Sequence, residues 1–482
     1  MEILEIFGER VSFRVGEKGR IGANKLDVLT GPNGSGKTDA LTSLVKRFAI
    51  TNTRQMSALR NQNTYDASSQ NMSFTWAADG PARVIVQTFS PFTRFPAPLE
   101  SGQRLLDLYQ AGDVKIDEYI SVGLHKSYRN VAGNVARKVL EESLYRLSES
   151  SESVKSIFGV MDDLEFERTF KLIYRPKPSA QAVFKNATFE SVLDWIDRRQ
   201  DDRRFGVSAT RLRREIGKRQ ISEVAEVIFN SISIVNSEKK SDLKIYELIF
   251  NFENAKEYFH MLQAYALLRR LDLISLAGCE IKPRWSKRGY FDISEASSGE
   301  QQMLCSIFGI ASSIRRNSLV LIDEPELSLH PKRQMEYVDA LVAIMKQTEG
   351  CHVFVSTHSP IIVQAAQNLG AGITQLGDTV ANALSTDPGM QVSVEQALVD
   401  VFRTPIPNSS HVSNQIFKAI VQAETGGASE QEAAKGRLRT LQAIYNDGEG
   451  SSETRQLLMD AFELVENSAQ DADEDDESVE PY

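Results

Sequence analysis

A glycine-rich segment, Gly31–Thr38, carries the residue types that surround phosphate groups. It reads Gly-Pro-Asn-Gly-Ser-Gly-Lys-Thr, which fits the phosphate-loop pattern GxxxxGK[ST]. Glycines let successive backbone N–H groups wrap an anion, and the helix that follows adds the positive end of its dipole. We expect Lys37 to reach the β- and γ-phosphates of ATP and Thr38 to bind Mg²⁺. The full set expected to bind the nucleotide is Asn33, Gly34, Ser35, Gly36, Lys37 and Thr38.

Two carboxylates follow the short apolar segment Leu319–Ile322. A buried strand that ends in acidic residues places them at the carboxyl edge of a sheet, where ligands bind. We expect Asp323 to hold the metal and Glu324 to orient or deprotonate the attacking water, because phosphoryl transfer depends mainly on positioning. The alternative is that the two carboxylates only end an ordinary strand. The presence of a phosphate loop in the same chain makes that alternative the weaker one.

Two further segments add specific chemistry. Ser297–Gln301 (Ser-Ser-Gly-Glu-Gln) resembles the signature of ABC ATPases, and Ser356–Pro360 (Ser-Thr-His-Ser-Pro) resembles their switch-histidine loop. The resemblance implies that Ser298, Gly299 and Glu300 contact the nucleotide held by a second copy, while His358 contacts the γ-phosphate in its own chain. Glu300 replaces the second glycine of the commonest signature. A plain helix N-cap at Ser298 is the structural alternative.

Gln87 lies near the end of the β-branched segment Arg83–Phe89. It is the candidate glutamine that links ATP and metal to an inserted arm, and we treat it as a third metal-binding residue beside Thr38 and Asp323. A single glutamine at a strand end serves packing as often as binding, so both interpretations stay open.

Alternating strands and helices must position these residues. The sequence predicts strands and helices in the order that forms a parallel sheet covered by helices. The expected strands are Ile3–Phe7, Val11–Val15, Leu26–Thr30, Arg83–Phe89, Leu319–Ile322 and His352–Ser356, and the expected helices are Asp39–Ile50, Gln302–Arg315 and Lys332–Gln347. The fold class is therefore α/β: an ABC-type ATPase head with a phosphate loop and a mixed sheet covered by helices, a helical inserted arm and a helical C-terminal cap.

Five regions follow from the patterns along the chain. We expect an N-terminal head lobe over 1–100, a mainly helical insertion over 101–280, a C-terminal head lobe over 281–390, a helical cap over 391–468 and a disordered acidic tail over 469–482. The arm contains a segment rich in arginine, Asp197–Gln220. That segment could contact DNA or RNA, although a solvated helix with internal ion pairs is the slightly favoured alternative.

Bulk properties exclude several classes of protein. The net charge of −10 is concentrated in the acidic end of the chain, so the body is near neutral. The three cysteines are far apart and indicate neither a zinc ribbon nor a disulfide framework. No apolar run is long enough to span a bilayer, and the N-terminus does not read as a signal peptide, so we expect a cytoplasmic protein without membrane contact.

The motifs together resemble a known group. The run Asp323–Pro331, followed by Ser356–Pro360, is similar to stand-alone ABC/AAA-like ATPases related to OLD proteins, RecF and SMC heads. Within that group, the length, the segment Gln87–Phe92 and the helical cap resemble the PtuA ATPases of Septu and retron-associated anti-phage systems. This implies an ATP-binding and ATP-hydrolysing regulatory subunit that dimerises head to head, or forms a higher oligomer, and controls a separate nuclease, with an HNH-type nuclease favoured.

Three alternatives to this regulatory function are open. The first is a RecF- or SMC-like DNA-repair ATPase, whose relatives use a longer coiled coil or a hook cysteine pair. The second is a sensor ATPase of the PARIS type. The third is a self-contained OLD-type nuclease, which requires a further metal-binding domain after the head, and the acidic residues that follow Gly370 cluster in the tail instead of at strand ends.

Overall fold

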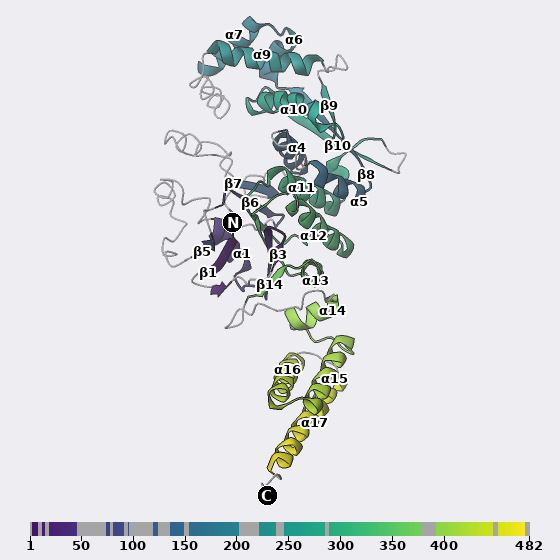
Figure 1. Cartoon of the computed structure of the whole chain (residues 1–482). Coiled ribbons are helices and arrows are strands. Elements are labelled where there is room, and N and C mark those ends of the chain that lie inside the picture. Colours follow the sequence, from purple (N-terminus) through teal and green to yellow (C-terminus); the bar gives the residue numbers. More distant parts are fainter. Residues whose placement is uncertain are drawn as a thin grey trace.

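The computed structural model describes residues 2–7, 12–14, 19–45, 74–77, 81–90, 95, 119–123, 135–148, 154–201, 221–237, 245–284, 289–376, 392–446 and 452–477. These residues form an elongated molecule (Figure 1). A central sheet lies in the middle, a second sheet with helices lies toward one end, and a group of C-terminal helices extends toward the other.

The central sheet confirms the predicted α/β head. Its strand order is β14-β4-β13-β12-β6-β7, with neighbouring strands parallel along this path and β3 pairing antiparallel to β4. All residues of β4, β12 and β13 are buried, as expected for apolar strands covered on both faces. The bounds are β3 (Arg20–Ile21), β4 (Asn24–Thr30), β6 (Arg83–Thr88), β7 (Tyr119–Gly123), β12 (Ser318–Asp323), β13 (His352–Ser356) and β14 (Gly372–Gln375).

Different helices cover the two faces of this sheet (Figure 1). Residues Val86, Leu319 and Leu321 pack with α1 (Lys37–Val45) on one face. Their sequence neighbours, such as Ile85, point to the other face. There they join a core with α11 (Ser298–Ser313), α12 (Pro331–Met345) and α13 (Pro360–Asn368). A small antiparallel sheet has the order β2-β1-β5, formed by β1 (Glu2–Phe7), β2 (Ser12–Arg14) and β5 (Phe74–Ala77).

The segment expected to be a mainly helical arm also contains a sheet, which the sequence analysis did not predict. Antiparallel strands β11-β10-β8-β9 pair there. In β8, Phe170, Leu172 and Tyr174 are buried in alternation, while Lys171 faces outward and pairs with acidic residues of β9 and β10. This alternation of apolar and charged residues is a strand signal that was available in the sequence. The bounds are β8 (Phe166–Pro176), β9 (Tyr246–Asn251), β10 (Ile274–Pro283) and β11 (Phe291–Asp292).

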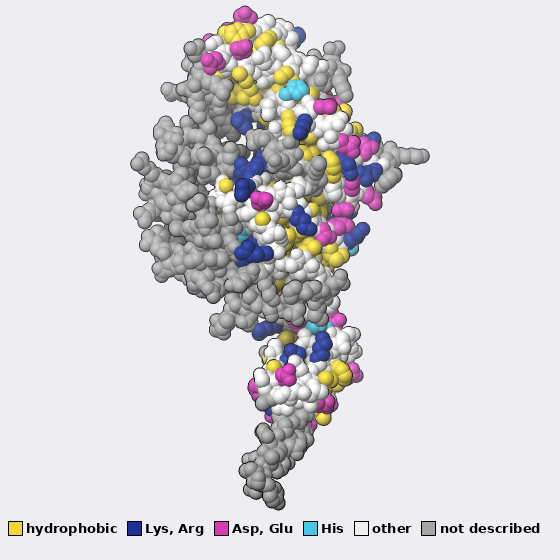
Figure 2. Space-filling model, in the orientation of Figure 1, with side chains coloured by type: hydrophobic (Ala, Val, Ile, Leu, Met, Phe, Trp, Pro, Cys, Tyr) yellow, Lys and Arg dark blue, Asp and Glu magenta, His cyan; other side chains and the backbone are white. Residues whose placement is uncertain are grey.

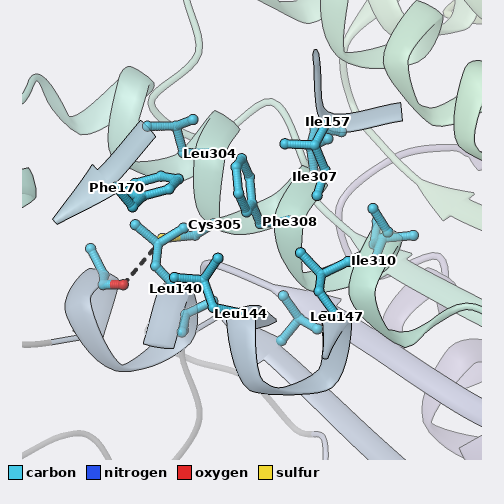
Figure 3. Packing of buried hydrophobic residues seen from close by; sticks show 14 of the residues in the cluster. Leu140, Leu144, Leu147, Ile157, Phe170, Leu304, Cys305, Ile307, Phe308 and Ile310 are labelled. Atoms are coloured by element: carbon cyan, nitrogen blue, oxygen red, sulfur yellow. Dashed lines mark hydrogen bonds between the residues drawn. The ribbon is translucent and has the colours of Figure 1, made fainter. Parts of the chain in front are cut away.

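The expected region boundaries also change. The boundary at 280/281 falls inside β10, and the central sheet extends beyond residue 100 because β7 belongs to it. Helix α4 packs along α11, so the arm shares one continuous core with the head (Figure 3). The helices of this part are α4 (Val135–Leu147), α5 (Val154–Asp163), α6 (Gln181–Lys185), α7 (Phe189–Asp201), α9 (Ile221–Ser237) and α10 (Ala255–Arg270).

The C-terminal region is helical, as predicted. Helices α15 (Ser410–Thr425), α16 (Ala428–Asn446) and α17 (Ser452–Glu477) pack around their own apolar core after the short elements α14 (Val394–Gln396) and η9 (Ala397–Val401). Helix α17 continues into the acidic segment that we expected to be disordered.

Two smaller expectations concern the whole chain. The three cysteines are buried and form no disulfide. None of the helices among the described residues has the length and apolar character needed to cross a membrane.

Candidate functional site

Three loops meet at the carboxyl edge of the central sheet. Strands β4, β13 and β12 are adjacent and parallel, so the loops after them lie side by side. They carry the phosphate loop, the Ser356–Pro360 segment and the Asp323–Glu324 pair. The hydroxyl of Thr38 lies 3.2 Å from each carboxylate oxygen of Asp323. The structure therefore brings together residues that the sequence placed far apart.

The phosphate loop has the backbone conformation that its glycines allow. Gly31 has a φ of 145°, and a Cβ atom there would lie 2.2 Å from the carbonyl oxygen of Leu376, so only glycine fits. Asn33 and Gly34 are exposed, which leaves the outer side of the loop open to a ligand. The Lys37 ammonium group donates to the carbonyl oxygens of Gly31 at 2.7 Å and Pro32 at 3.0 Å. It thus occupies the hollow of the loop.

Burial and neighbouring carboxylates shape the charge of this site. Burial lowers the pKa of Lys37, and Glu324, Asp323 and Glu326 oppose that shift. Burial raises the pKa of Asp323 to about 6. A buried carboxylate beside a hydroxyl is an oxygen donor set that suits Mg²⁺, and a divalent cation would favour the ionised form of Asp323. The residues present therefore fit the metal expected from the sequence.

Glu324 follows β12, and His358 follows the neighbouring strand β13. Glu324 has a φ of 49°, a conformation that non-glycine residues rarely adopt, and its backbone N–H donates to the Ser356 carbonyl oxygen at 2.9 Å. Burial and the charge of Lys37 lower the pKa of His358, while Glu324 acts to raise it. A neutral imidazole is therefore the favoured form near pH 7.

Glu326 is a site residue that the sequence reasoning did not identify. Its Oε1 atom accepts a hydrogen bond of 2.7 Å from the backbone N–H of His358. Burial raises the pKa of Glu326, and that hydrogen bond opposes the shift. Glu326 lies two residues after Glu324, so its place in the acidic run was the available signal. It joins the loop after β12 to the loop after β13.

The signature segment begins α11, and its N-cap differs from the structural alternative considered for Ser298. The N-cap is Ser297, not Ser298: the Ser297 hydroxyl accepts from the Glu300 N–H at 3.3 Å, and Glu300 Oε2 accepts from the Ser297 N–H at 2.9 Å. The Glu300 carboxylate thus serves the cap, and its role at a nucleotide stays a prediction. Ser298 is exposed. A Cβ atom on Gly299 would lie 2.9 Å from the Ser328 carbonyl oxygen.

Gln87 lies on the wrong face of the sheet to share a metal with Asp323. Side chains alternate along a strand, and Gln87 is paired in register with Ile322, whose side chain belongs to the core on the α11 side. Gln87 is fully buried, donates to the Ser306 hydroxyl at 2.7 Å and accepts from the Tyr337 hydroxyl at 3.2 Å. Both amide atoms are therefore engaged in hydrogen bonds inside the core, which favours the packing interpretation of Gln87 over the metal role.

Two features of the surface bear on possible partners. His330 is exposed at the N-cap of α12, where a second copy could reach it. Most of the arginine-rich segment Asp197–Gln220 lies outside the described residues, which end at Asp201 and resume at Ile221. On the face seen in Figure 2, the Lys and Arg side chains of the described residues lie scattered among acidic and neutral ones.

Comparisons with known proteins find similarity to ATPases over part of the chain. Residues 135–363 match a family described as the AAA ATPase domain. None of the curated proteins matches the chain. The Smc head domain of Pyrococcus furiosus, with an extended coiled coil and bound to the C-terminal domain of ScpA, is 13% identical, covering 80% of this chain and 96% of that one with a TM-score of 0.31. An Smc head bound to the C-winged helix domain of ScpA is 10% identical, covering 81% and 98% with a TM-score of 0.29.

Proposed function

We propose that this chain binds ATP with Mg²⁺ at the carboxyl edge of its central sheet and hydrolyses it. The observation that carries the proposal is the contact of the Thr38 hydroxyl with both carboxylate oxygens of Asp323 at 3.2 Å. A phosphate loop and a metal-binding carboxylate are the two parts that phosphoryl transfer requires, and the family match over residues 135–363 supports the same activity.

Each residue has a role that its position supports. Lys37 exchanges its loop carbonyl partners for the β- and γ-phosphates, and the loop N–H groups orient them. Mg²⁺, when bound, neutralises charge on those phosphates. Glu324 orients the attacking water and accepts its proton. His358 is held by Glu326 through its backbone and presents its side chain to the γ-phosphate.

The site is completed by a second copy of the chain in this proposal. Ser298 is exposed at the start of α11, and the N-terminus of a helix is a favourable place for an anion. In a two-fold dimer, Ser298 and Gly299 of each copy would face the phosphate loop of the other. ATP would then act as the link between two heads.

The biological role proposed here is regulatory. We infer from the sequence resemblance to PtuA ATPases that the dimer belongs to a bacterial anti-phage complex and controls a separate nuclease, with an HNH-type enzyme favoured. A DNA-repair ATPase of RecF or SMC type would use the same head chemistry. Affinity purification of the tagged chain from its native cells separates the two, because a nuclease partner supports the first and recombination proteins support the second.

Two substitutions test the chemistry. Lys37→Ala removes the counter-ion of the phosphates and should abolish binding of a fluorescent ATP analogue, whereas Glu324→Gln should bind the analogue and release phosphate slowly. Lys282→Ala removes a surface ion pair on the second sheet and is the control. It should leave both the binding of the ATP analogue and the release of phosphate unchanged. Wild-type binding by Lys37→Ala would rule out this site.

A mixture of two inactive variants tests the shared site. Lys37→Ala disables the phosphate loop, and Ser298→Arg disables the surface offered to the other copy. A mixed dimer retains one intact composite site, so co-expressed variants with different tags should regain phosphate release after tandem purification. No recovery in the purified mixed dimer would contradict the composite site.

A further inference from the structure

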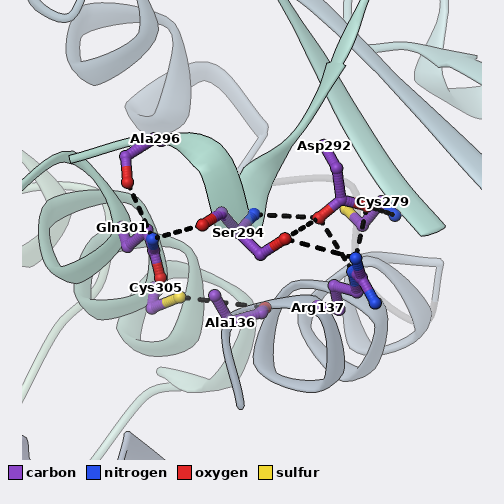
Figure 4. Close-up of polar contacts among 8 residues, drawn as sticks. All are labelled: Ala136, Arg137, Cys279, Asp292, Ser294, Ala296, Gln301 and Cys305. Carbon is purple, nitrogen blue, oxygen red and sulfur yellow. Dashed lines mark hydrogen bonds and ion pairs between the residues drawn. The ribbon is translucent and has the colours of Figure 1, made fainter. Parts of the chain in front are cut away.

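The loop before α11 is tied to the second sheet and to α4. We call residues Ile293–Ser297 the signature loop, because they lead directly into Ser298. Figure 4 shows Asp292 at the end of β11 on one side of this loop and Gln301 of α11 on the other. The loop is short and partly exposed, so its position depends on these two anchors.

The first anchor is a charged pair between α4 and β11. Arg137 Nε lies 2.8 Å and 2.9 Å from the two carboxylate oxygens of Asp292, and Arg137 Nη2 donates to the Ser294 hydroxyl at 3.2 Å. The pair is largely shielded, with side-chain exposures of 24% and 14%. One guanidinium group therefore contacts both the strand end and the loop.

Asp292 collects further donors around the same carboxylate. It accepts from the Ser294 N–H at 2.9 Å and from the Cys279 N–H of β10 at 3.1 Å. Burial acts to raise the pKa of Asp292, but the hydrogen bonds from Ser294 and Arg137 hold it below its usual value. The carboxylate is thus ionised and joins β10, the signature loop and α4 at one point.

The second anchor fixes the other end of the loop. Gln301 Nε2 donates to the carbonyl oxygens of Ala296 at 2.8 Å and Ser294 at 3.3 Å. Gln302 Nε2 donates to the Pro325 carbonyl oxygen at 2.7 Å, which ties α11 to the loop after β12. Ser298 is therefore placed between the metal-binding loop of its own chain and the α4 pair.

The α4 helix is held in place by packing against α11. Leu140 and Leu144 of α4 pack against α11, and Cys305 of α11 lies 3.8 Å from the Ala136 carbonyl oxygen, one residue before Arg137 (Figure 3). A displacement of α4 or of the second sheet would therefore reach Ser298 through Arg137 and Asp292.

We propose that Arg137 is a positioning residue which, through Asp292, holds the signature loop so that Ser298 meets the nucleotide of a second copy. This inference rests on the proposed ATPase function and its shared site. Arg137 is assigned no contact with the nucleotide. Its loss should therefore impair hydrolysis at the partner's phosphate loop and spare nucleotide binding at its own.

The first test compares two arginines of α4. Arg137→Ala should lower kcat about 10-fold or more, the scale set by a charge-assisted hydrogen bond, with unchanged binding of a fluorescent ATP analogue. Arg146→Ala is the matched control, because Arg146 pairs with Glu142 on its own helix, and its kcat should stay at the wild-type value. Arg137→Ala with wild-type kcat would overturn the proposal.

The decisive test assigns Arg137 to one half of the shared site. Co-expressed Arg137→Ala and Lys37→Ala should regain activity, because one site of the mixed dimer has an intact phosphate loop and an intact signature surface. Co-expressed Arg137→Ala and Ser298→Arg should show no more activity than Arg137→Ala alone, because both defects lie in the signature surface. The opposite pattern overturns the proposal.

Two further experiments distinguish a failure of the Arg137 proposal from a failure of the shared site. If Lys37→Ala recovers activity with Ser298→Arg but not with Arg137→Ala, the role of Arg137 is refuted and the shared site is still supported. If neither mixture recovers activity, the shared site is refuted. If Arg137→Ala unfolds, Asp292→Asn replaces it, because its amide oxygen can still accept from Ser294 while the charge that pairs with Arg137 is lost. Asp292→Asn should complement Lys37→Ala, and failure in a folded dimer counts against the proposal.

Discussion

The hydroxyl of Thr38 lies 3.2 Å from both carboxylate oxygens of Asp323, although 285 positions separate the two residues. The parallel order β4-β13-β12 produces this contact, since it brings the ends of β4 and β12 to the two sides of β13. The contact joins a phosphate-binding helix to a buried carboxylate.

The raised pKa of Asp323 makes metal-free stability depend on pH. The folded-state pKa is about 6 and the ordinary value is 3.8, so the folded protein binds more protons between these values and loses stability as pH rises through that window. The loss is at most about 3 kcal/mol at pH 7. Asp323→Asn should match the wild type near pH 4 and be more stable at pH 7 without Mg²⁺. Urea unfolding of both proteins from pH 4 to pH 7 measures this difference in the free energy of unfolding. A difference that does not change with pH would contradict the prediction.

Gly299 should tolerate no side chain. A Cβ atom would lie 2.9 Å from the Ser328 carbonyl oxygen, so Gly299→Ala must shift the backbone at the cost of about 1–3 kcal/mol and displace Ser298. Thermal unfolding and phosphate release should both report the change. Gly159→Ala in α5 is the control: no atom lies near its added Cβ, and alanine favours a helix, so stability should rise by roughly 0.5–1 kcal/mol.

Gln87 should matter for stability and not for the metal. Gln87→Leu leaves the buried hydroxyls of Ser306 and Tyr337 without this partner, which should destabilise the fold by about 1–3 kcal/mol per unpaired group. The Mg²⁺ concentration that supports half-maximal nucleotide binding should be unchanged. A shift in that concentration in a folded variant would restore Gln87 as a metal ligand.

The regulatory proposal predicts that DNA cleavage requires a second protein. Among the described residues, no group of three or more His, Cys, Asp or Glu side chains is placed to hold a metal ion. We expect the purified chain to leave plasmid and oligonucleotide DNA intact with Mg²⁺ or Mn²⁺, and cleavage to begin when the nuclease subunit is added. The control is Lys37→Ala with the same nuclease. Cutting by the chain alone, lost on mutation of its own carboxylates, would support an OLD-type nuclease.

The sequence alone determined the parts of the site that depend on short-range order. The phosphate loop, the Asp323–Glu324 pair and the His358 loop each follow a strand directly, so local patterns sufficed to find them and to predict the α/β head. The second sheet was missed although β8 alternates apolar and charged residues from Phe170 onward, because its segment was interpreted as helical from its overall charge.

Tertiary structure decided which distant side chains meet. The pairing of Gln87 with Ile322 sets the face on which Gln87 lies, and strand register between segments cannot be read from either segment alone. The contact of Arg137 with Asp292 crosses 155 positions and arises because α4 packs on α11. Such contacts depend on how whole elements pack, and packing is fixed by the combined apolar faces of many residues, which no short motif contains.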